Sequence, residues 1–224
     1  KHYVVGMPYR LIRMKQHNGS TNKSTPQIVY ISTNLYNTGF GISQKTDYGR
    51  AVDEGKLITN VLSKLPHNVR YKTYPEDNRR YADIDPVLRV LKSANNIELF
   101  YKKIDMRYLV FEHRVFITTC ATSTLGWPVM SGKPVVFINQ KNNSPLTDEA
   151  HASLSKGLFI FDDTENNFHR NLRGFLSQPI DVIEKLWKEK EVARKEMIRE
   201  YFSAYSGGSG RRASKIIIKE YLKR

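Results

Sequence analysis

The sequence predicts an α/β fold, in which a parallel sheet of about six strands carries helices on both faces and is followed by further helices. Short runs of apolar and β-branched residues alternate with segments of helical periodicity. Most positions within these runs are apolar, and the pattern becomes entirely helical after residue 165. Strands that are apolar along their whole length are typical of a parallel sheet, because helices bury both of its faces.

Each strand is predicted from a short apolar run bounded by polar or turn-forming residues. These runs are residues 27–33, 69–73, 97–101, 115–119, 134–139 and 158–161. One helix is expected around Val52, Leu57, Ile58, Val61 and Leu62, which share one face at helical spacing. The other predicted helices are residues 85–94, 105–111, 122–131, 148–154, 168–176, 180–205 and 213–222, with a break at 205–210. Asp85 is expected to cap its helix, with Pro86 at the first helical position.

We expect three segments along the chain. Residues 1–26 indicate a linker or the remnant of a preceding domain, because the stretch 16–26 is polar and turn-rich and the sequence starts at Lys1 rather than at a methionine. Residues 27–165 are expected to form a Rossmann-like domain. Residues 166–224 are expected to form a basic helical segment that packs on it.

The 224-residue chain has a formal net charge of +14, and many of its basic residues lie between 185 and 224. Three interpretations are open: an ordinary solvated helix face, contact with an anionic membrane surface, or contact with nucleic acid. Nucleic acid is the least favoured, because the sequence carries no DNA- or RNA-binding signature. No apolar run approaches the ~20 residues of a membrane span, and the sequence does not open with a signal-peptide pattern.

The numbers and positions of the cysteine and histidine residues bear on whether the chain forms disulfides or binds a metal. Cys120 is the only cysteine, which excludes an intrachain disulfide and fits a reducing, cytoplasmic compartment. The six histidines are scattered along the chain, so the sequence predicts no metal site and no metal cofactor.

Small polar residues follow the fourth predicted strand, at the edge where parallel α/β sheets bind ligands. Thr122, Ser123 and Thr124 offer hydroxyls and backbone N–H groups at the start of a helix, whose dipole favours a phosphate. The alternative is that Thr122 or Ser123 only caps that helix.

Charged and glycine residues follow two other strands. Lys72 could neutralise a phosphate, with Pro75 fixing the turn after it, or could be an ordinary surface lysine. Arg79 suits a bidentate phosphate contact, but a solvated loop is the alternative. Gly39 and Gly41 would let the backbone approach a ligand closely, unless they belong to an ordinary loop.

Together these motifs resemble the C-terminal domain of bacterial surface-polysaccharide glycosyltransferases with the GT-B fold, and particularly enzymes that use CMP-activated ulosonic acids, the sialyl and Kdo transferases. That family has a Lys-x-His-Pro motif after a strand, a later Ser/Thr pair and a Gly-Lys-Pro-Val strand start. The matching segments are Lys72-Thr73-Tyr74-Pro75, Ser123-Thr124 and Gly132-Lys133-Pro134-Val135. The likeness covers residues 72–139 closely and 27–165 in outline. Taken alone, Gly132 and Pro134 indicate only a helix C-cap and a strand start.

The resemblance implies inverting transfer of a sugar from a nucleotide-sugar donor to a glycan acceptor, in the cytoplasm or at the inner membrane face. Lys72, Tyr74, Ser123 and Thr124 would stabilise the leaving phosphate. Asp105 would contact the base or ribose, unless it only caps a helix. The general base would belong to an N-terminal domain across the cleft.

One departure leaves the donor open. Tyr74 replaces the family's histidine, so CDP- and UDP-linked donors stay open beside CMP-linked ones. A polyol-phosphate transferase and a non-catalytic module, whose basic tail docks on a membrane or polyanion, are the alternative functions. A nucleotide-sugar epimerase is not favoured, because no acid/base pair supports it.

Overall fold

The computed structural model describes residues 2–6, 26–33, 45–73, 85–205 and 207–222. Within them, six strands form one sheet in the order β3-β2-β1-β4-β5-β6, and every neighbouring pair is parallel. The strands are β1 (Ile28–Ile31), β2 (Val69–Lys72), β3 (Ile97–Phe100), β4 (Val115–Thr118), β5 (Val135–Asn139) and β6 (Phe159–Asp162). The predicted α/β fold with its parallel sheet is therefore confirmed, with small differences at the strand ends.

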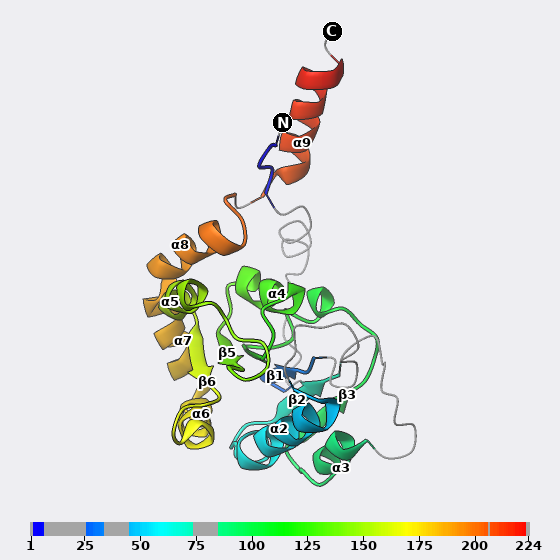
Figure 1. Ribbon diagram of the computed structural model, residues 1–224, viewed down its shortest axis with the longest axis vertical. Coiled ribbons are helices and arrows are strands. Elements are labelled where there is room, and N and C mark those ends of the chain that lie inside the picture. Colours follow the sequence, from blue (N-terminus) through cyan, green and yellow to red (C-terminus); the bar gives the residue numbers. More distant parts are fainter. Residues whose placement is uncertain (1, 7–25, 34–44, 74–84, 206, 223–224) are drawn as a thin grey trace.

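Helices cover both faces of this sheet, because successive strand residues point to opposite sides (Figure 1). Tyr30 and Ile117 belong to the core on one face, and Val29 and Phe116 to the core on the other. The helices of the first face are α2 (Asp47–Asn60), α3 (Pro86–Lys92) and α6 (Phe168–Leu176), and those of the second are α4 (Ser123–Ser131), α5 (Asp148–Gly157) and α8 (Glu191–Tyr201). The helix α7 (Ile180–Glu189) joins the two cores, since Ile183 packs in the first and Trp187 in the second.

Two of the predicted helix ends are confirmed in detail. The Asp85 carboxylate caps α3 by accepting hydrogen bonds from the backbone N–H groups of Val87 (2.8 Å) and Leu88 (3.1 Å), and Pro86 occupies the first helical position. Gly132 ends α4 with a φ of 76°, a left-handed conformation that glycine adopts without strain. The structural interpretation of the segment from Gly132 to Pro134 therefore holds.

The first helix, α2, ends at Asn60 and so leaves out the predicted Val61 and Leu62, and α5 extends to Gly157. Three other predicted helices differ more from the structure. The segment 105–111 holds only a short 3₁₀ turn, η2 (Met106–Tyr108), after which the N–H groups of Leu109 and Val110 both donate to the Met106 carbonyl. The predicted helix over 180–205 divides into α7 and α8 at Lys190, whose amine donates to the Ser155 carbonyl at 2.9 Å and so fixes the bend against α5. The last helix, α9 (Ser209–Ile217), starts earlier than predicted, directly after Gly208 with its φ of 71°, and continues into a π-helical turn, Ile218–Leu222.

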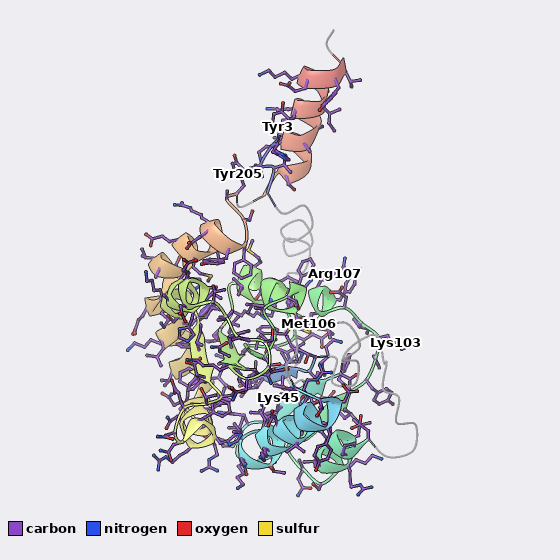
Figure 2. All side chains as sticks on the ribbon, in the orientation of Figure 1. Tyr3, Lys45, Lys103, Met106, Arg107 and Tyr205 are labelled. Atoms are coloured by element: carbon purple, nitrogen blue, oxygen red, sulfur yellow. The ribbon has the colours of Figure 1, made fainter. Side chains whose placement is uncertain are left out.

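Helix α9 stands apart from the sheet, with the N-terminal residues 2–6 beside it (Figure 1). The Arg212 guanidinium holds this arrangement, because it donates to the Val5 carbonyl at 3.0 Å and lies 3.9 Å from the centroid of the Tyr205 ring. Figure 2 shows Tyr3 and Tyr205 at the same end of the molecule. None of the helices in the described part of the chain is long and apolar enough to cross a membrane.

Helices α5 and α8 approach each other closely at Gly157. A Cβ atom at this position would lie 2.9 Å from Met197 Cε and 3.0 Å from Arg194 Cα, which is closer than side chains normally come. We therefore expect Gly157→Ala to lower the free energy of unfolding by about 2 kcal/mol, the typical cost of overpacking a core. Chemical denaturation measures this change.

Gly174→Ala in α6 is the matched control. A Cβ atom there meets nothing within 4 Å, so the same change removes backbone freedom from the unfolded chain without a clash. It should raise the unfolding free energy by about 0.5–1 kcal/mol. Equal effects of the two substitutions would contradict the close packing of α5 on α8.

Candidate functional site

The order in which the chain adds strands reverses between β1 and β4, and the loops after these two strands lie at the carboxyl edge of the sheet. β1 and β4 are central neighbours, yet their connections run to opposite sides of the sheet, toward β2 and β5. In open α/β sheets a crevice forms at such a switch point, outside the carboxyl ends of the strands, and ligands bind there. The residues that follow the two strands are therefore the first candidates for binding.

The loop between β4 and α4 brings two of the predicted threonines together. Thr122 Oγ1 lies 3.0 Å from Thr124 Oγ1, and Thr122 is exposed. Thr122 occupies the N-cap position of α4, but its hydroxyl makes no capping hydrogen bond to the helix backbone. Capping is therefore not the role of the Thr122 side chain. Ser123 is the first residue of α4, so its backbone N–H belongs to the free N-terminus of that helix.

Lys72 lies at the end of β2 and is buried, with 1% of its surface exposed. The surface-lysine interpretation is therefore wrong. Its amine donates to the Thr73 carbonyl at 3.2 Å. Burial lowers the pKa of this amine, and the charge of Asp105 partly opposes that shift. Lys72 therefore places a buried amine at the end of β2, and its role with phosphate stays a prediction.

Asp105 is the cap of the short turn η2. Its Oδ1 accepts from the Arg107 backbone N–H at 2.9 Å, and its Oδ2 pairs with the Arg107 guanidinium at 2.7 Å. Burial would raise the pKa of this carboxyl, but the Arg107 hydrogen bonds, with the charges of Arg107 and Lys72, hold it below its usual value. The Arg107 guanidinium also lies 5.4 Å from the centroid of the Trp127 ring in α4, which places η2 beside that helix (Figure 2). The capping role of Asp105 is confirmed, and a contact with base or ribose stays a prediction.

The remaining predicted site residues are Tyr74, Arg79, Gly39 and Gly41. All four lie outside the described residues.

A buried carboxylate beneath the switch point was not predicted. Glu54 of α2 is 4% exposed. It accepts hydrogen bonds from the hydroxyls of Tyr30 (2.5 Å), Tyr71 (2.5 Å) and Ser32 (3.0 Å). Burial, followed by the charge of Glu54, raises the pKa of Tyr30 well above its usual value, while a hydrogen bond from Thr119 acts in the opposite direction. This network ties α2 to β1, β2 and the start of the β4–α4 loop.

The sequence carried a signal for this network. Glu54 falls three, four and seven positions before Leu57, Ile58 and Val61, so it lies on the apolar face of α2. A charged residue within an apolar helix face indicates a buried partner, because an unpaired charge there is costly.

A hollow of about 110 Å³ opens beside this network, between α2, α6 and the ends of β4 and β5. Most of its lining residues have polar or charged side chains, among them Thr119, Gln140, Asp53, Asp163 and His169. Among the described residues, no three His, Cys, Asp or Glu side chains gather so that they could hold a metal ion.

No protein-family model matches the chain, and no curated protein matches it in sequence. Solved structures do match its fold. A sucrose-phosphate synthase from Thermosynechococcus elongatus has a TM-score of 0.51 at 11% identity over 98% of this chain, and the glycotransferase of kitacinnamycin has a TM-score of 0.50 at 14% identity over 89%. The chain has the fold of one half of a GT-B protein.

This chain spans about half of each GT-B structure, 51% of the synthase and 45% of the kitacinnamycin enzyme. At these identities the likeness establishes the fold alone. It agrees with the GT-B architecture that the sequence motifs implied, and it does not distinguish among donors. The six-stranded sheet and the helices that follow it correspond to the Rossmann-like half of a GT-B fold.

Proposed function

We propose that this chain is the donor-binding half of a glycosyltransferase and holds a nucleotide sugar by its phosphate. The observation that carries the proposal is the N-terminus of α4 at the switch point of a GT-B half, where the hydroxyls of the exposed Thr122 and the half-buried Thr124 lie 3.0 Å apart. Backbone N–H groups at a helix N-terminus form a phosphate site together with the positive end of the helix dipole.

In this proposal two kinds of group stabilise the departing phosphate: hydrogen-bond donors and a positive charge. Thr122, Thr124 and the backbone of Ser123 donate hydrogen bonds at the β4–α4 turn, and the buried Lys72 supplies a positive charge from the end of β2. Such preorganised donors favour the leaving group as negative charge develops on it. The general base and the glycan acceptor site would come from the other half of the GT-B fold.

The donor that we favour is a CMP-linked ulosonic acid, transferred with inversion to a bacterial surface glycan. Its support is the order of the Lys72, Ser123-Thr124 and Gly132-Lys133-Pro134 motifs along the sequence. Because Tyr74 stands where that family has a histidine, CDP- and UDP-linked sugars and polyol phosphates are the competing donors.

Calorimetric titration of the chain with CMP, CDP, UDP and GDP, repeated with Thr122→Asp, tests this function. Aspartate is a favourable N-cap residue, so the substitution should leave the melting temperature unchanged or raise it. It also places a negative charge where the phosphate would bind, and we expect nucleotide affinity to fall at least about tenfold. Thr147→Asp is the matched control, because Thr147 is the exposed N-cap residue of α5, the next helix along the chain.

The outcomes separate the possibilities. Binding of one cytidine nucleotide that Thr122→Asp weakens and Thr147→Asp leaves intact would support both the site and the favoured donor class. Preference for UDP would keep the site and change the donor. Equal binding by wild type and Thr122→Asp would exclude the α4 N-terminus as the phosphate site.

A non-catalytic docking module is the second candidate, and α9 favours it. Arg211, Lys215 and Lys219 are exposed on this helix and its π-helical continuation, next to the exposed Ile217 and Ile218. A basic amphipathic helix of this kind can lie on an anionic membrane. Vesicle binding that falls steeply with salt, in a chain that binds no nucleotide, would favour this function over sugar transfer.

A further inference from the structure

A groove of about 810 Å³ lies on the side of the domain formed by α4, α7 and α8. Gly132, Lys133 and Pro134 line one wall, directly before β5 begins, so the groove opens near the amino edge of the sheet. The candidate phosphate site lies at the carboxyl edge, where α4 begins. The two places are therefore at opposite ends of α4, and nothing in the proposed function uses the groove.

The floor of the groove is mainly apolar. Val129, Met130, Trp187 and Ile198 contribute to it. The Trp187 indole is fixed from two sides, because its Nε1 donates to the Gly132 carbonyl at 2.7 Å and the Arg194 guanidinium lies 3.8 Å from its ring centroid. A volume of this size, with a mainly apolar floor whose indole is held by a hydrogen bond and a cation–π contact, is typical of a preformed small-molecule site.

The rim of the groove carries an excess of positive charge. Its two acidic residues are already engaged, since Glu184 accepts from Arg114 at 2.8 Å and Glu191 pairs with Lys195 at 2.6 Å. Lys188 and Arg199 also line the groove and are exposed. No ion pair involves either of them within the described part of the chain.

We propose that this groove binds an anionic amphiphile, whose alkyl chain lies on the Trp187 floor and whose phosphate head is held by Lys188 and Arg199. The apolar floor and the cationic rim match the two parts of such a molecule. Helix α9 of a second copy fits less well, because its exposed side chains include Arg211, Lys215 and Lys219, which carry the same charge as the rim. A neutral apolar ligand would leave the rim charges without a counterpart.

Decyl phosphate, added as a monomer below its micelle concentration, tests the proposal in the full chain carrying Trp127→Phe. The chain has two tryptophans, so this variant leaves Trp187 as the only indole reporter. Saturable one-to-one binding should shift the Trp187 emission. Reversal of the rim charges with Lys188→Glu and Arg199→Glu should weaken the affinity at least about tenfold. The exposed pair Lys185→Glu and Lys102→Glu carries the same change of charge outside the groove and should leave the affinity within about twofold of the parent.

A third variant tests the apolar part of the groove. Ala204 lines the groove and is exposed, so Ala204→Trp fills the space without replacing a core side chain, and it should abolish decyl phosphate binding as measured by calorimetry in the wild-type background. The proposal is overturned if neutral decyl glucoside binds as tightly as decyl phosphate, or if inorganic phosphate alone competes fully. Equal loss of affinity in the rim and control pairs would also overturn it, because a general charge effect would then explain binding. None of these results bears on the nucleotide titrations.

Discussion

Glu54→Ala is expected to lower the free energy of unfolding by about 4 kcal/mol, because the substitution removes the acceptor of three buried hydroxyls at once. Tyr30 and Tyr71 are both fully buried and Ser32 nearly so, and all three donate to this one carboxylate. Without it, the Tyr30 hydroxyl loses its buried acceptor, while Tyr71 keeps only Ser32 Oγ at 2.9 Å and Ser32 only the more distant Thr33 carbonyl at 3.3 Å. Urea denaturation monitored by circular dichroism measures the change.

Asp53→Ala is the matched control for this substitution. Asp53 is the neighbouring acid on α2, partly exposed and paired with Lys45 at the surface. Ion pairs at the surface contribute little to stability, so Asp53→Ala should lower the free energy of unfolding by less than about 1 kcal/mol. Combining Glu54→Ala with Tyr30→Phe and Tyr71→Phe should cost less than the sum of the separate changes, because the hydroxyls that lose their acceptor are then absent. Strict additivity, or a loss under 1 kcal/mol for Glu54→Ala, would contradict the network.

Acid is expected to destabilise the protein through His113, by up to about 3 kcal/mol between pH 6.5 and 4. His113 is fully buried, and burial lowers its pKa to about 4. The positive charges of Arg70, whose Nη1 lies 3.5 Å from the imidazole Nε2, and of Lys133 act in the same direction, while the hydrogen bond to the Pro26 carbonyl opposes them. The unfolded chain therefore takes up a proton near pH 6.5 that the folded protein resists until about pH 4. Stability is complete above this window and is lost as the pH falls through it.

His113→Asn isolates this contribution from that of the carboxylates. Asparagine can keep a donor near the Pro26 carbonyl, which accepts from Nδ1 of His113 at 2.8 Å, but it cannot titrate. The variant should be less stable at pH 7.5 and should lose less further stability than the wild type when the pH falls to 4.5. Denaturation curves at both pH values measure these free energies of unfolding. An equal loss of stability in the two proteins would show that His113 does not titrate in this range.

The parallel sheet could be predicted from the sequence because its strands are buried on both faces. β1, β4 and β5 are buried along their whole length, so their apolar runs are uninterrupted. The division of the helix over 180–205 could not be predicted in the same way. Lys190 bends the chain by bonding to the carbonyl of Ser155 in α5, and such a tertiary contact leaves no periodic trace in the local sequence.

The residues of the candidate site could likewise be predicted from the sequence only in part. Thr122 and Thr124 could be identified because strand, small polar residues and helix are adjacent in the sequence. The burial of Lys72 could not, because it depends on how the ends of β2 and the turn η2 pack in space. The Glu54 network joins residues from α2, β1 and β2, and only its carboxylate stands out locally, as a charge on an apolar helix face.

The strand order has a consequence for how the chain folds. β1, β2 and β3 pair in sequence order, and so do β4, β5 and β6, so each trio can assemble from nearby segments. Within the sheet the two trios meet where β1 pairs with β4, from Ile28 with Val115 to Ile31 with Thr118, and this pairing closes a much longer loop of chain. Closing a long loop costs conformational entropy before the contacts it allows can form, so we expect the joining of the trios to be a slow, late step of folding. We therefore expect the crevice at the switch point, which lies between β1 and β4, to form only with this last pairing.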